Sequence, residues 1–111
     1  MQEGSSLNAF KFNHVPVLAN EVIESIKKLP TKLLKEGLII DATLGYGGHS
    51  ALILKNYPEI NIIGIDQDPN SRKAASHNLK NFGSRIKILE GNFGHFTPPR
   101  KVAMVFADLG V

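Results

Sequence analysis

The sequence contains no cysteine, which excludes disulfide bonds, thiolate metal sites and cysteine redox chemistry. It also lacks any run approaching the roughly 18 apolar residues that a membrane helix requires. Its first eight residues show neither a secretory apolar core nor an Arg-rich amphipathic pattern. No internal repeat or low-complexity segment is visible. These absences predict a soluble, cytoplasmic protein.

The composition is that of a globular protein. The 111 residues fit one domain of the common size, and 42% hydrophobic with 21% charged residues allow a packed core. The formal net charge of +3 is compatible with an RNA partner. Many proteins that bind no nucleic acid have a similar charge, so this signal carries little weight.

The hydrophobic pattern alternates between strands and helices. Apolar residues at helical spacing predict an amphipathic helix over residues 17–29, which Pro30 ends. Short apolar or β-branched runs predict strands at residues 38–40, 60–65, 86–90 and 102–106, and good helix formers predict helices over residues 50–56 and 71–79. This order predicts an α/β fold with an open, doubly wound parallel sheet.

We divide the chain into an N-terminal segment, residues 1–36, and a sheet-forming segment, residues 37–111. Val111 follows the fourth strand so closely that no helix can cover that strand. An uncovered apolar strand invites pairing with another chain. We therefore expect an incomplete Rossmann-like domain that contains strands one to four only.

The strongest motif is DATLGYGGH at residues 41–49, where the first strand turns into a helix. Glycines allow the backbone to adopt positive φ and to approach a ligand closely, and a helix N-terminus offers N–H groups to a carboxylate or phosphate. The motif therefore indicates a site for a polar or anionic ligand. An ordinary tight turn between a strand and a helix would use the same glycines, so the motif alone leaves both interpretations open.

Asp66 ends the second strand about twenty residues after these glycines, where an acid can accept hydrogen bonds from ribose hydroxyls. The alternative is a cap for the following helix. Asp68 is the better candidate for that cap because it directly precedes Pro69.

Asp108 ends the fourth strand, and ligands of open α/β sheets lie beyond the carboxyl ends of the strands, where the strand order reverses. If strand four lies beside strand one, opposite strand two, then the glycine motif, Asp66 and Asp108 line one crevice.

Phe93 is a candidate to stack on an adenine, and a role in the core is about equally plausible. His14 is a candidate for the lip of the site, although a cap or surface role is commoner. We interpret His77 and His95 as surface residues and predict no metal site.

The motifs also narrow the class of ligand that the site can bind. No Gly-Lys-Ser or Gly-Lys-Thr follows the glycines, which argues against a P-loop nucleotide site. NAD stays open, because glycines with a distal acid also describe a dinucleotide site. However, Ser50 stands where G-x-G-x-x-G has its third glycine, which weakens that interpretation.

Four segments together resemble one family: HVPVL at 14–18 with Glu21 and Val22, DATLGYGGHS at 41–50, GIDQDP at 64–69 and DLGV at 108–111. The chain is similar to the bacterial 16S ribosomal RNA cytosine-N4 methyltransferases, which are class I enzymes that use S-adenosylmethionine (SAM). The resemblance covers nearly the whole chain from His14 onward.

The resemblance implies SAM contacts at these positions: Gly47, Gly48, His49, Asp66, Phe93 and Asp108. Asp66 would hold the ribose, Phe93 would border the adenine, and Asp108 would lie at the methionine end as the candidate catalytic residue. The implied reaction is methylation of a cytosine N4 amine, and the implied partner is 16S rRNA in the small ribosomal subunit rather than DNA or a membrane. Such enzymes have a helical insertion and later strands that are absent here, so we expect this chain alone to be inactive. An NAD-dependent oxidoreductase and a cofactor-binding module without catalysis are the alternatives.

Overall fold

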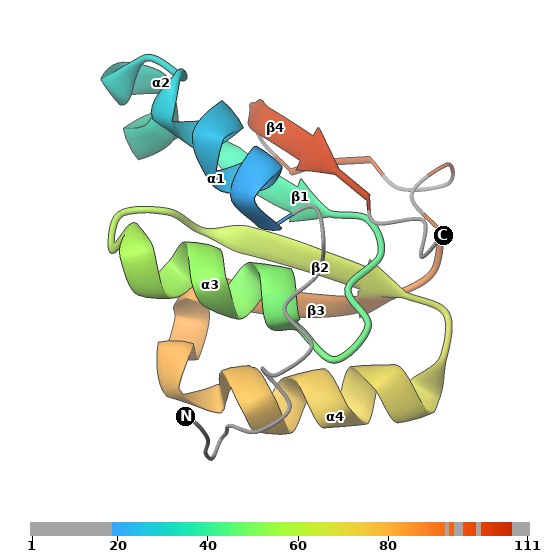
Figure 1. Cartoon of the computed structure of the whole chain (residues 1–111). Coiled ribbons are helices and arrows are strands. Elements are labelled where there is room, and N and C mark those ends of the chain that lie inside the picture. The colour runs from blue at the N-terminus through green and yellow to red at the C-terminus, as the bar shows by residue number, and fades with distance from the viewer. Residues whose placement is uncertain (1–18, 93, 95–96, 100, 108–111) are drawn as a thin grey trace.

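A computed structural model describes residues 19–92, 94, 97–99 and 101–107, which form a four-stranded parallel sheet with helices packed against it (Figure 1). The elements follow the chain in this order: α1 (Ala19–Lys27), α2 (Thr31–Glu36), β1 (Leu38–Asp41), α3 (Gly48–Asn56), β2 (Ile62–Asp66), α4 (Pro69–Leu79), the 3-10 helix η2 (Lys80–Arg85), β3 (Ile86–Glu90) and β4 (Val102–Phe106). The strand order is β3-β2-β1-β4. The predicted open α/β sheet is therefore confirmed, and β4 lies beside β1 on the side opposite β2.

The two central strands, β1 and β2, are buried on both faces, which is why their sequences are continuous apolar runs. On one face, strand residues pack with α1 and α3 in a cluster of buried side chains: Val22, Ile26, Ile39, Ile53, Leu54, Ile60, Ile62 and Phe106. The buried cluster on the other face consists of strand residues: Leu38, Ile40, Ile63 and Ile65. Figure 1 shows α1, α3 and α4 on the same side of the sheet. The sheet is thus the centre of the fold.

The N-terminal helix α1 is part of this core. Val22 is 7% exposed and Ile26 is fully buried against the sheet, as the predicted apolar stripe requires. Pro30 follows α1 and begins α2, a second short helix that the sequence did not predict. Leu34 of α2 packs against the same cluster as Ile26. The segment before β1 therefore contributes two helices rather than one.

Arg85, at the end of η2, connects the far end of α3 to the sheet. Its Nη2 donates to the carbonyls of Leu54 (2.9 Å) and Tyr57 (2.7 Å), and its Nε donates to the carbonyl of Ile60 (3.2 Å). The last carbonyls of a helix have no partners within the helix, so a guanidinium at this place satisfies them. Arg85 is therefore a structural residue.

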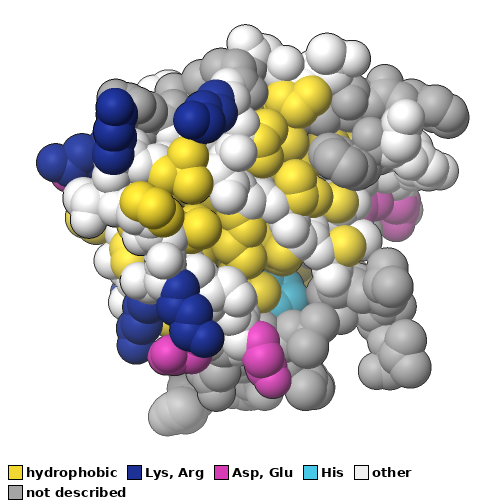
Figure 2. All heavy atoms as spheres, turned by 90° about the horizontal axis from the view of Figure 1, so that it is seen from above, with side chains coloured by type: hydrophobic (Ala, Val, Ile, Leu, Met, Phe, Trp, Pro, Cys, Tyr) yellow, Lys and Arg dark blue, Asp and Glu magenta, His cyan; other side chains and the backbone are white. Residues whose placement is uncertain are grey.

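The strand β4 forms one edge of the sheet, as the strand order shows. Its Val105 is 43% exposed, which is unusual for a valine within a strand. Figure 2, which looks down on the end of the molecule where α2 and β4 lie, shows hydrophobic side chains gathered on this surface with basic side chains at its margin.

Within the described part of the chain, no helix has the length and apolar character needed to cross a bilayer.

Candidate functional site

The loop between β1 and α3 is held by hydrogen bonds that its amides donate to two neighbouring strands. The amide of Ala42 donates to the carbonyl of Phe106 at the end of β4 (2.9 Å), and the amide of Leu44 donates to the carbonyl of Ile65 in β2 (3.1 Å). A further turn closes where the Gly47 amide donates to the Leu44 carbonyl (2.9 Å). The loop therefore lies across the carboxyl ends of β4, β1 and β2. In this sheet the strand order reverses between β1 and β4, where open α/β folds bind ligands.

Gly47 and Gly64 allow this loop to pack closely on its neighbours. Gly47 has φ +91°, and a Cβ on it would lie 2.8 Å from Cδ1 of Leu79 in α4. Gly64 lies in the middle of β2, where a Cβ would lie 2.5 Å from Cδ1 of Leu44. The first glycine is needed for both its backbone angle and its packing, and the second allows the loop to pack directly on the sheet.

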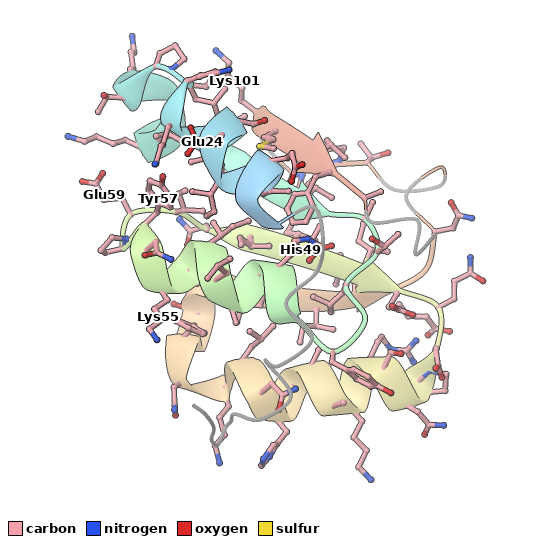
Figure 3. All side chains as sticks on the ribbon, in the orientation of Figure 1. Glu24, His49, Lys55, Tyr57, Glu59 and Lys101 are labelled. Atoms are coloured by element: carbon pink, nitrogen blue, oxygen red, sulfur yellow. The ribbon has the colours of Figure 1, made fainter. Side chains whose placement is uncertain are left out.

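The N-terminus of α3 faces this edge of the sheet. Its cap residue, Gly47, is left-handed and supplies no side-chain oxygen to the first-turn amides. His49, in that first turn, is only 6% exposed, and its ring meets the Phe106 ring edge to face, with centroids 5.4 Å apart and planes at 67°. Figure 3 shows His49 at the loop end of α3, while Tyr57 and Glu59 lie at the opposite end. A helix N-terminus capped by glycine is a suitable place for an anionic group.

Asp66 lies beside the glycine loop, which is the juxtaposition that the sequence predicted. Its Oδ2 accepts a hydrogen bond from the Gly45 amide and its Oδ1 accepts one from the Asp68 amide, each at 2.9 Å. An ionised carboxylate offers about four lone-pair sites, so these two bonds leave acceptor capacity on both oxygens. The half-buried carboxylate can therefore hold the loop and still accept hydrogen bonds from a ligand.

Asp68 caps the next helix, as predicted. Its Oδ1 accepts from the Asn70 amide (3.0 Å) and its Oδ2 accepts from the Ser71 hydroxyl (3.2 Å), with Pro69 in the first turn of α4. The cap of α4 is thus supplied by Asp68, and Asp66 is directed toward the loop.

A pair of buried polar side chains was missed by sequence reasoning. The Ser50 hydroxyl donates to Oδ2 of Asp41 at 2.8 Å, and the Thr43 amide donates to Oδ1 of Asp41 at 3.2 Å. Asp41 is 1% exposed and Ser50 is fully buried. The sequence contained one signal of this pair: Ser50 stands where the dinucleotide-binding motif has its third glycine, so a polar side chain occupies a position that normally has none.

The other candidate residues divide into two groups. Phe93, Asp108, His14 and His95 lie outside the described residues. His77 is exposed on α4, as the sequence interpretation had it. Among the residues that the structure describes, no three histidine, aspartate or glutamate side chains converge as metal ligands. Of the candidate site residues, the structure describes Gly47, Gly48, His49 and Asp66.

The parallel sheet with its helices defines a fold class, because solved methyltransferase structures share this fold. The chain superposes on a geranyl diphosphate methyltransferase with a TM-score of 0.64 at 14% identity, covering 80% of this chain and 32% of that one. It superposes on the cyclopropane synthase MmaA2 from Mycobacterium tuberculosis with a TM-score of 0.61 at 16% identity, covering 79% and 30%. The fold is that of the class I methyltransferases.

The sequence match is more specific than the fold. The profile of the MraW methylase family matches residues 11–111, and the chain belongs to this family. It is 60% identical over 111 residues to ribosomal RNA small subunit methyltransferase H of Prochlorococcus marinus strain MIT 9211, and 49% identical over 100 residues to the protein of the same name from Synechococcus sp. strain CC9605. These alignments cover 100% and 90% of this chain but 36% and 33% of the relatives. The family resemblance is confirmed, and the chain spans about a third of the length of the curated relatives it matches.

Proposed function

We propose that this chain binds SAM at the carboxyl ends of β1 and β2. The observation that carries the proposal is the 2.9 Å hydrogen bond between the Gly45 amide and the Asp66 carboxylate. It brings a glycine-lined bend and an acid together at one edge of the sheet, which is the arrangement that an adenosyl ligand requires.

The chemistry of the donors and acceptors fits this cofactor. The first-turn amides of α3, at Gly48 and His49, suit the carboxylate of the methionine portion, because the cap residue Gly47 supplies no competing oxygen. Asp66 suits the ribose hydroxyls, since both of its oxygens retain acceptor sites. From the family resemblance we assign contact with the adenine to Phe93 and contact with the methionine end to Asp108.

We propose further that the full-length protein methylates the N4 amine of a cytosine in 16S rRNA. The family and the names of the relatives support an RNA substrate from the small ribosomal subunit. SAM supplies an electrophilic methyl group on a sulfonium. A cytosine amine is a poor nucleophile because its lone pair is delocalised into the ring, so the protein has to align it with that methyl group. We assign to Asp108 either acceptance of a hydrogen bond from this amine or orientation of the cofactor.

The base has to leave its stack to reach such a site, as base-modifying enzymes generally require. The relatives are about three times as long as this chain, and we place the RNA-recognition surface in the part beyond the alignment. We therefore propose that the 111-residue chain binds cofactor and does not catalyse methyl transfer on its own.

Calorimetric titration of the 111-residue chain with S-adenosylhomocysteine (SAH), and separately with NADH, tests the cofactor assignment. We expect binding of SAH and none of NADH, and the reverse would favour the oxidoreductase alternative. A chimera that continues this chain with the remainder of the Prochlorococcus marinus relative tests the reaction. We expect it to transfer labelled methyl groups from SAM to small ribosomal subunits. A chimera that binds SAH but methylates no RNA would contradict the assigned reaction and leave the cofactor site intact.

A further inference from the structure

The buried pair formed by Asp41 and Ser50 is not explained by contact with a cofactor. Asp41 is the last residue of β1, and Ser50 is the third residue of α3. They are 1% and 0% exposed, so neither side chain has surface to offer a ligand. Their 2.8 Å hydrogen bond joins the two ends of the segment that contains the glycine loop.

The bond between Ser50 and Asp41 connects the end of β1, where the loop begins, to the first turn of α3, where the loop ends. On the strand side, the other carboxylate oxygen of Asp41 accepts from the Thr43 amide at 3.2 Å, which sets the first turn of the chain after β1. On the helix side, Ser50 lies in the first turn of α3 together with Gly48 and His49. A carboxylate near a helix N-terminus is also favoured by the helix dipole. The position of that first turn relative to β1 therefore depends on this pair.

We infer that Asp41 and Ser50 are positioning residues, which hold the first turn of α3 in the orientation that binds the carboxylate of SAM. This inference rests on the proposed cofactor site. It also explains why Ser50 replaces the third glycine of the dinucleotide motif. A glycine there would allow close packing of helix and strand, whereas serine adds a hydroxyl that reaches the strand end. Ser50, whose presence weakens the NAD interpretation, thus helps to hold the glycine loop in place.

The test compares two serines that are each the third residue of a helix and donate to an aspartate. The bond of Ser50 is buried, whereas Ser71 of α4 donates to Asp68 at 3.2 Å on the exposed side, so Ser71→Ala removes a serine–aspartate bond that does not support the glycine loop. We expect Ser50→Ala to raise the dissociation constant for SAH roughly tenfold in the 111-residue chain, and Ser71→Ala to leave it within about twofold. Ser50→Cys, which has similar volume and keeps a weak donor, should lose less affinity than Ser50→Ala, and it takes the place of Ser50→Ala should that variant fail to fold.

Hydrogen exchange of the ligand-free protein supplies a second measurement. Ser50→Ala should increase exchange at the amides of residues 43–50 and leave those of β2 unchanged, because only the loop loses its support. Equal SAH affinity and equal exchange in wild type and Ser50→Ala would overturn the inference while leaving the cofactor site in place. A wild-type chain that binds no SAH would instead contradict the proposed function, and the exchange experiment would still decide whether the pair orders the loop.

Discussion

Substitution of Gly47 by alanine tests how strongly the loop depends on one residue. The backbone at Gly47 has φ +91°, and an added Cβ would approach Cδ1 of the fully buried Leu79 to 2.8 Å. A non-glycine residue in the left-handed region costs about 1–3 kcal/mol, and overpacking a buried leucine costs about 1–3 kcal/mol more. The expected loss of unfolding free energy is therefore about 2–6 kcal/mol, against a typical total of about 5–15 kcal/mol.

A double-mutant cycle separates the packing cost from the backbone cost. Leu79→Val removes the Cδ1 atom that the added Cβ would meet, whereas the backbone angle at position 47 stays the same. Gly47→Ala should therefore cost less unfolding free energy in the Leu79→Val background than in the wild type. Urea denaturation followed by circular dichroism measures both costs, and their difference reports the contact with Leu79. Equal costs in the two backgrounds would refute the packing argument.

Three further predictions concern binding and stability. Asp66→Ala should weaken SAH binding by about 1.5–3 kcal/mol, the scale of a hydrogen bond to a charged group, and unchanged affinity by calorimetry would remove Asp66 from the site. Arg85→Lys should lower the unfolding free energy by about 1–3 kcal/mol, because a single ammonium cannot reproduce the three bonds that the guanidinium makes to carbonyls, and an unchanged thermal midpoint would count against that account. Ile26→Ala should cost about 2–5 kcal/mol through the cavity it leaves beside the sheet, whereas a loss below about 1 kcal/mol would mean that α1 is not part of the core.

The sheet could be predicted from sequence because its signals are local. The central strands are buried on both faces, and this alone gives the continuous apolar runs at β1 and β2. The place of Asp66 beside the glycine loop followed from a general property of parallel sheets, whose carboxyl ends share one edge. The cap at Asp68 followed from its position before Pro69.

What the sequence did not predict depends on contacts between distant elements. The short helix α2 has no side-chain cap, and Leu34 gains its burial from the cluster around Ile26 rather than from helical propensity. The bond between Ser50 and Asp41 depends on how α3 returns against β1, which no pattern within either segment specifies. The interpretation of Ser50 as a departure from the glycine motif said nothing about the partner of its hydroxyl.

Gly64 couples the glycine loop to the interior of the sheet, because Leu44 of the loop packs directly on it. Any side chain at this position would displace Leu44, the residue by which the loop packs on β2. Mutational scanning of β2 should therefore find position 64 intolerant even of alanine. Variants there that still fold should lose cofactor first, although the altered atom belongs to the hydrophobic centre and faces no ligand.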